Sequence, residues 1–189
     1  QFCTYCIVPY TRGREVSRPQ RTIAAEAAAL VAEGYREIEL LGQTINAYRC
    51  PEGGADFSHL LRTVGSLEGL HRLRFVTSHP RHFGSDLIDA MTSTPAVCPY
   101  LHLPVQAGSD PVLRRMRRRY TRREYLELVE RIRSAMPGIN LSTDIIVGFP
   151  GESEADFELT LDLLEQVRFG QVLAFAYYPR PGTPAARYE

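Results

Sequence analysis

The spacing of hydrophobic and polar residues predicts helices and strands that alternate along most of the chain. Apolar residues at helical intervals predict helices at about residues 23–33, 57–64, 85–91, 122–135 and 154–167. Short apolar or β-branched runs predict strands at about residues 37–41, 73–77, 100–103, 141–147 and 172–177. Thr22 is expected to cap the first helix, and Asp110 a short additional helix that runs through Met116. Alternation of this kind implies parallel strands with right-handed crossovers, in an α/β fold that is either a β/α barrel or a doubly wound sheet.

The residues that follow the predicted strands favour the barrel. Each strand is followed by an unusual segment: Gly42-Gln43, Ser78-His79-Pro80, Pro104-Val105-Gln106, residues 148–152 and residues 179–182. Barrel enzymes assemble their sites from the C-terminal ends of their strands. Ser78 and Gln106 therefore stand where a convergent site needs hydrogen-bonding groups. The glycines around Pro150 are expected to set a backbone turn and not to bind phosphate, because no lysine follows them.

Composition and charge narrow the class of protein. With 189 residues and 44% hydrophobic content, the chain is long enough for one substantial domain. No apolar run approaches the roughly 20 residues that a membrane span needs, and no secretory signal is present, which agrees with a cytoplasmic protein that does not bind membranes. All 22 basic residues are arginine and the formal net charge is zero. The densest arginine cluster, residues 114–123, fits either a solvated helix face, which we favour slightly, or contact with a nucleic-acid backbone.

The cysteines carry the clearest chemical signal. Cys3 and Cys6 are separated by two residues, so both thiolates can bind one metal centre. A zinc ribbon needs a second close pair, whereas Cys50 and Cys98 stand alone and are expected to be small apolar or surface residues. If Cys3 and Cys6 end a Cys-x-x-x-Cys-x-x-Cys loop, the first ligand lies at position −1, before Gln1.

The cysteine loop and the strand-end motifs together resemble radical S-adenosylmethionine (SAM) enzymes, and within them the tRNA methylthiotransferases of the MiaB type. The likeness runs in order through residues 3–19, 40–43, 77–80, 101–106, 142–152 and 179–184. Thr44, Ile45 and Ala47 depart from the usual Gln-Asn-Val-Asn-Ser pattern of the family, so Asn46 receives no role. Ala107 replaces a commoner serine.

The resemblance implies a fold and a set of cofactor ligands. The fold is a partial (β/α)6 TIM-like barrel whose first strand is missing from this chain, with residues 1–178 as the core and residues 179–189 as a linker toward an absent C-terminal RNA-binding domain. Cys3 and Cys6 would be the second and third ligands of a [4Fe-4S] cluster whose fourth iron binds SAM. The implied SAM contacts are Tyr5 beside the adenine, Gly42 and Gln43 near the methionine amino group, and Ser78, Gln106 and Asp144. For Asp144, a neighbouring arginine is an equal alternative to a ribose hydroxyl.

The resemblance also implies an activity. The family adds a methylthio group to C2 of N6-isopentenyladenosine next to the tRNA anticodon, with a reducing electron donor as partner and a second [4Fe-4S] cluster in an N-terminal domain that this chain lacks. The chain alone is therefore expected to be catalytically incomplete. Two alternatives within the class are methylthiolation of threonylcarbamoyl-adenosine tRNA and of a ribosomal-protein aspartate. An alternative of another class is a β/α scaffold with a structural zinc pair and an RNA-binding arginine face.

Overall fold

The computed structural model describes residues 3–76 and 78–188 and divides the chain into two compact units. Unit 1 comprises Gln1–Glu15, Pro104–Glu130 and Leu141–Glu189, and unit 2 comprises Val16–Leu103 and Arg131–Asn140. Helix α6 (Arg122–Ala135) begins in unit 1 and ends in unit 2. Within the described residues, no helix has both the length and the apolar content to cross a lipid bilayer.

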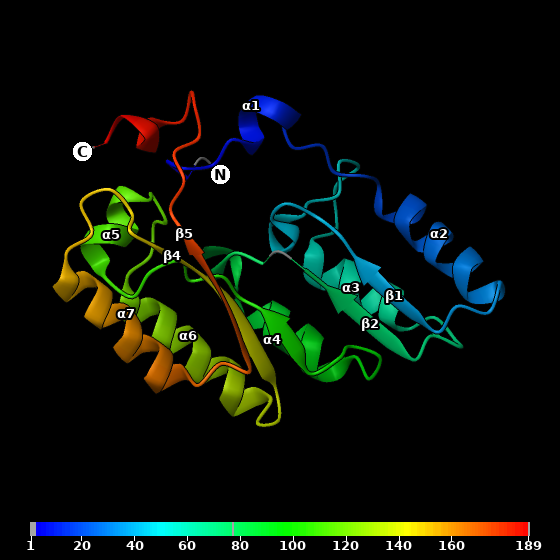
Figure 1. The fold of residues 1–189 in the computed structure, drawn as a ribbon. Helices are drawn as coiled ribbons and strands as arrows, with labels where there is room; N and C mark the ends of the chain where they lie inside the picture. Colours follow the sequence, from blue (N-terminus) through cyan, green and yellow to red (C-terminus); the bar gives the residue numbers. More distant parts are fainter. Residues whose placement is uncertain (1–2, 77, 189) are drawn as a thin grey trace. The chain divides into compact units, whose positions relative to one another are not determined.

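Unit 2 is built on parallel strands with helices between them. Strands β1 (Glu37–Leu40) and β2 (Arg72–Phe75) lie side by side in parallel, with Glu37 opposite Arg72 (Figure 1). A parallel bridge from Leu73 to Val97 extends this pairing just before β3 (Tyr100–His102). The helices are α2 (Gln20–Ala32), α3 (Phe57–Gly65) and α4 (Ser85–Ser93). Short 3-10 turns, η1 (Ile45–Ala47) and η2 (Pro80–His82), follow β1 and β2.

The core of unit 2 lies between α3 and the strands. Phe57 at the start of α3 meets Phe75 at the end of β2 edge to face, with ring centroids 5.1 Å apart. Leu61, Val64 and Leu73 have no exposed surface. Both β1 and β2 alternate exposed and buried residues, so one face of each strand contributes to this core.

Unit 1 contains the second pair of parallel strands. Strand β4 (Asn140–Val147) pairs in parallel with β5 (Gln171–Ala176), with Ser142 opposite Gln171, and α7 (Glu154–Val167) connects them (Figure 1). The remaining elements are α1 (Val8–Arg12), α5 (Asp110–Arg115) and η3 (Pro184–Arg187). A reciprocal capping box fixes the start of α7, because the Ser153 side chain accepts from the Asp156 N–H while Asp156 accepts from the Ser153 N–H.

Two predicted helix caps are wrong. Thr22 lies inside α2, which begins at Gln20 after Pro19, since proline fixes a backbone angle that suits the entry to a helix. Asp110 is the first residue of α5, and its side chain accepts a 2.6 Å hydrogen bond from the N–H of Arg122, the first residue of α6. The carboxylate of Asp110 therefore serves the N-terminus of the second helix instead of the first.

Candidate functional site

A buried threonine anchors the cysteine loop to the rest of unit 1. The Thr4 N–H donates to the Met116 carbonyl at 3.2 Å, and the Thr4 hydroxyl donates to the Arg115 carbonyl at 2.8 Å. The Thr4 carbonyl accepts from the Ala185 N–H at 2.9 Å. Thr4 has no exposed surface, and these three hydrogen bonds satisfy its N–H, hydroxyl and carbonyl groups inside the protein. The end of α5 and the start of η3 thus fix the backbone between the two cysteines.

Cys3 and Cys6 lie on either side of this anchor as free, half-buried thiols. The Cys6 N–H donates to the Cys3 carbonyl at 3.1 Å, which closes the loop into a tight turn. Among the described residues, no three or more His, Cys, Asp or Glu side chains form a group that could hold a metal ion. The loop therefore offers two thiolates to a metal centre and needs further ligands from elsewhere.

Arg118 is a buried cation beside Cys3. Its guanidinium donates to the Cys3 Sγ at 3.5 Å, to the Pro104 carbonyl at 2.7 Å and to the Tyr120 hydroxyl at 2.9 Å. The side chain is only 5% exposed, and none of its partners among the described residues is a carboxylate. Because a buried charge without a counter-charge is costly, this arrangement suits an anionic group bound at the cysteine loop.

The protonation state of Arg118 is fixed by its surroundings. Burial lowers the pKa of the guanidinium, but Tyr120, Tyr5 and Cys3 raise it by more, so the net shift of the pKa is upward. Arginine therefore keeps its charge here at any physiological pH. The phenol of Tyr120 donates onward to the Val105 carbonyl at 2.7 Å, which holds the ring that the guanidinium contacts.

Tyr5 packs against the segment that follows β4. Its ring meets Phe149 edge to face at 6.1 Å, and Phe149 also contacts the rings of Tyr177 at 5.2 Å and Tyr188 at 6.4 Å. Burial raises the pKa of the Tyr5 phenol far above its ordinary value, and Arg118 opposes the rise. The phenol is therefore neutral and can donate a hydrogen bond.

The segment after β4 is a self-contained turn, as predicted. Gly148 and Gly151 have positive φ angles of 72° and 76°. The Glu152 carboxylate accepts from the N–H groups of Gly148 at 2.5 Å and Phe149 at 3.2 Å. Since a carboxylate already occupies these donors, this turn does not present them to a phosphate.

Gln106 and Asp144 lie side by side. The Gln106 N–H donates to the Asp144 carbonyl at 2.9 Å, and the Gln106 carbonyl accepts from Ile146 at 2.9 Å. Gln106 has a φ of 78°, which is unusual for a residue other than glycine, and it is 8% exposed. Asp144 is half-buried on β4. The strained backbone turns Gln106 away from the strand geometry of its neighbours, and such strain is concentrated at functional positions.

Gly42, Gln43 and Ser78 belong to unit 2. Gly42 follows β1, and a Cβ at this position would lie 3.3 Å from the Cα of Ile45, so the chain passes close to η1 there. Gln43 is exposed. Ser78 is 4% exposed, and its hydroxyl has no hydrogen-bond partner within the described part of the chain. Thr77, which belongs to the same sequence motif, lies outside the described residues.

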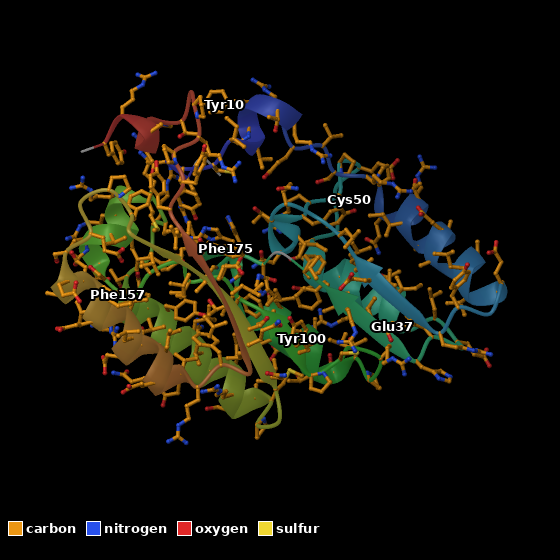
Figure 2. The ribbon with its side chains drawn as sticks, in the orientation of Figure 1. Tyr10, Glu37, Cys50, Tyr100, Phe157 and Phe175 are labelled. Atoms are coloured by element: carbon orange, nitrogen blue, oxygen red, sulfur yellow. The ribbon has the colours of Figure 1, made fainter. Side chains whose placement is uncertain are left out.

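The two other cysteines are placed differently from each other. Cys98 is buried, as expected of a small apolar residue. Cys50 is partly exposed in a hydrogen-bonded turn after η1 (Figure 2), and hydrogen bonds from the backbone at Gln20 and Glu52 lower the pKa of its thiol.

Sequence reasoning missed Arg118 and did not recognise the role of Thr4. Arg118 lies in the arginine run for which a solvated face is predicted, and most arginines of that run are exposed, but Arg118 itself is buried. Arg122 also departs from that interpretation, since it donates to the carbonyls of Gly108 and Leu159 and pairs with Asp162 at 2.5 Å. In the sequence, Met116 and Tyr120 stand two positions before and two positions after Arg118. This spacing was the available signal that Arg118 faces inward, and all three residues are buried in the structure.

Comparison with known proteins places the chain in a family. Residues 1–164 match the radical SAM superfamily. The chain belongs to the radical SAM superfamily. A protein of Desulfosudis oleivorans called tRNA-2-methylthio-N(6)-dimethylallyladenosine synthase is 54% identical over 188 residues, which cover 100% of this chain and 40% of that protein. Proteins of the same name from Carboxydothermus hydrogenoformans and Parafrankia sp. are 54% and 56% identical and are covered to 43% and 38%. The chain therefore spans about two fifths of the length of these curated relatives.

Solved radical SAM structures share the fold. The Escherichia coli coproporphyrinogen III oxidase HemN is 18% identical with a TM-score of 0.62, covering 99% of this chain and 44% of that chain. Methylornithine synthase PylB is 16% identical with a TM-score of 0.62, covering 100% and 53%. Streptococcus suis SuiB bound to S-adenosylmethionine is 11% identical with a TM-score of 0.67, covering 99% and 40%. These likenesses, with the parallel strand pairs, confirm the predicted α/β class and the partial TIM-like barrel of the radical SAM type.

Proposed function

We propose that the chain is the radical SAM core of an enzyme that adds a methylthio group to C2 of N6-isopentenyladenosine in tRNA, next to the anticodon. The observation that carries the proposal is the pair of half-buried thiols beside a buried arginine that has no carboxylate partner among the described residues. The sequence identity of about 54% to tRNA-2-methylthio-N(6)-dimethylallyladenosine synthases supports this choice of substrate.

Cys3 and Cys6 fit two of the three thiolate ligands of a [4Fe-4S] cluster, with the third ligand outside the described residues. Thiolates are the usual ligands of such clusters. The cluster and SAM supply radical chemistry when bound. Arg118 stabilises the negative charge of the Cys3 thiolate through its hydrogen bond to Sγ, and it is equally suited to the carboxylate of SAM.

The other proposed SAM contacts orient the cofactor. In unit 1, Tyr5 is assigned to the adenine, and Gln106 and Asp144 to polar groups of SAM. In unit 2, Gly42 and Gln43 are assigned to the methionine amino group, and Ser78 offers a buried hydroxyl. For Asp144, pairing with an arginine is the competing assignment. The further partners are tRNA and a reducing electron donor, with a second [4Fe-4S] cluster outside the described residues. Residues 179–189 are proposed to be a linker toward an RNA-binding domain outside the described residues.

Anaerobic reconstitution with iron and sulfide, in a protein extended upstream to include the third cysteine ligand, tests the metal centre. The expected result is iron and sulfide bound in equal amounts with the absorbance of a [4Fe-4S] cluster, lost in Cys3→Ala and Cys6→Ala. Cys50→Ala is the matched control, because Cys50 is an equally half-buried thiol with no proposed metal role. Bound zinc without sulfide would support the scaffold with a structural zinc pair instead.

Nucleoside mass spectrometry tests the substrate. In a strain that lacks the gene, tRNA is expected to accumulate N6-isopentenyladenosine and to lose its 2-methylthio derivative. Loss of methylthio groups from threonylcarbamoyl-adenosine, or from a ribosomal-protein aspartate, would favour one of the two alternative substrates.

A further inference from the structure

Asn46 joins two loops of unit 2 that are distant in sequence. Its side-chain Nδ2 donates to the His79 carbonyl at 2.9 Å, and the His79 N–H donates to its Oδ1 at 2.9 Å. The amide thus pairs with both peptide groups of His79, as a neighbouring strand would. Asn46 is 4% exposed and His79 is 5% exposed, so water competes little for these hydrogen bonds.

The two loops carry three of the proposed SAM contacts. Asn46 lies on η1, and the close approach of Gly42 to Ile45 ties η1 to the end of β1. On the other side, His79 directly follows Ser78, whose buried hydroxyl has no hydrogen-bond partner in the described residues. A buried hydroxyl without a partner is destabilising unless a ligand supplies one, and its direction depends on the backbone that Asn46 holds.

We infer that Asn46 is a positioning residue that holds the Ser78 hydroxyl in place to hydrogen-bond SAM. The inference rests on the proposed function, because it takes SAM as the ligand of these loops. The competing interpretation is a structural one, in which Asn46 only stabilises unit 2. The positioning role predicts that substitution of Asn46 lowers the affinity for SAM while the fold and the metal centre stay intact. The structural interpretation predicts no such separate loss of SAM affinity.

The test compares two substitutions of Asn46 in the cluster-loaded protein. Asn46→Asp keeps an acceptor for the His79 N–H but turns a second oxygen toward the His79 carbonyl, which repels it. Asn46→Ala removes both hydrogen bonds without adding charge, and answers the same question if the aspartate variant does not fold. Asn140→Asp is the matched control, because Asn140 is the only other asparagine of the chain and is exposed.

Equilibrium dialysis with radiolabelled SAM gives the main readout. Both Asn46 variants are expected to bind SAM about 3- to 10-fold more weakly, the range that loss of one neutral hydrogen bond produces. Iron and sulfide content should stay at the wild-type level, and the His79 amide should exchange hydrogen at least about tenfold faster, as expected when a buried hydrogen bond is lost. Ser78→Ala should weaken SAM binding similarly, and the double variant should add little, because both changes remove the same contact.

The outcomes separate the two proposals. Variants that bind SAM within twofold of the wild type overturn the positioning role alone. If the Asn46 variants bind SAM as tightly as the wild type but hold less iron and sulfide, the structural interpretation is favoured and the positioning role is overturned. If the cluster-loaded wild type does not bind SAM, the proposed function fails and this inference falls with it.

Discussion

Phe149 offers a quantitative test of the packing that supports the cysteine loop. Its side chain is 1% exposed and meets three aromatic rings, those of Tyr5, Tyr177 and Tyr188. Phe149→Ala removes the ring and leaves a cavity between these neighbours. Phe149→Leu is the matched control, since leucine fills much of the volume but cannot make edge-to-face contacts.

The expected loss follows from burial and from ring geometry. Truncation of a fully buried phenylalanine to alanine destabilises proteins by about 3–5 kcal/mol. With a urea m-value of about 2 kcal/mol per molar, the unfolding midpoint should fall by about 1.5–2.5 M. Each of the three edge-to-face pairs contributes about 0.5–1.5 kcal/mol beyond its buried area, so Phe149→Leu should still lower stability by at least about 1.5 kcal/mol.

Urea unfolding followed by circular dichroism measures both variants. A double-mutant cycle with Tyr5→Leu isolates the contact with the cysteine loop, for which we expect a coupling of about 0.5–1.5 kcal/mol. The reasoning is refuted if Phe149→Ala lowers stability by less than about 1 kcal/mol at an unchanged m-value, which no buried ring in a packed core would do.

Two further predictions concern single polar contacts. Asp110→Ala should lower stability by about 1 kcal/mol in urea unfolding, because the first N–H of α6, at Arg122, loses its acceptor. Asp110→Asn should retain most of that stability, since its side-chain oxygen can still accept. Equal losses in the two variants would contradict the cap. Hydrogen bonds from Arg72, then Arg74, hold the pKa of Glu37 below its ordinary value, so its contribution is present above that ordinary value and is lost as the pH falls through the folded-state pKa. Glu37→Gln should therefore lower stability at about pH 7 but much less at about pH 3, and an equal loss at both would exclude the ion pairs as the cause.

The long helices could be predicted because the residues that begin or end them lie within a few positions of each boundary. The predicted helices at residues 122–135 and 154–167 agree with α6 and α7 at both ends. A serine cap begins α7, and Pro137-Gly138 follows α6, so each boundary has a signal within a few residues. By contrast, α1 and the 3-10 turns η1, η2 and η3 span only three to five residues, too few for any periodicity to appear.

The candidate site likewise contains residues that belong to a local sequence motif and residues whose contacts are distant in sequence. Cys3, Tyr5 and Cys6 form a local motif, and the structure keeps this motif as one tight turn. Their proposed roles toward a cluster and SAM come from this motif together with the strand-end motifs. The contacts of Asn46 could not be predicted, because they are made to the backbone of His79, 33 residues away. A buried amide that pairs with a distant peptide group leaves no periodic or compositional trace in the sequence. The departures from the family pattern at Thr44, Ile45 and Ala47 also argued against a role for Asn46 in the sequence analysis.

Arg118 shows why a charge run is a poor guide to exposure. Its neighbours Arg117 and Arg119 both have left-handed backbone angles, with φ of 57° and 60°. Each such residue costs about 1–2 kcal/mol in a chain of L-amino acids. The two turns direct the flanking guanidiniums to solvent and bring Arg118 inward, against Pro104 and Cys3. A fold that accepts two strained residues to bury one arginine, with no carboxylate partner for it among the described residues, is shaped for a negative charge at the cysteine loop.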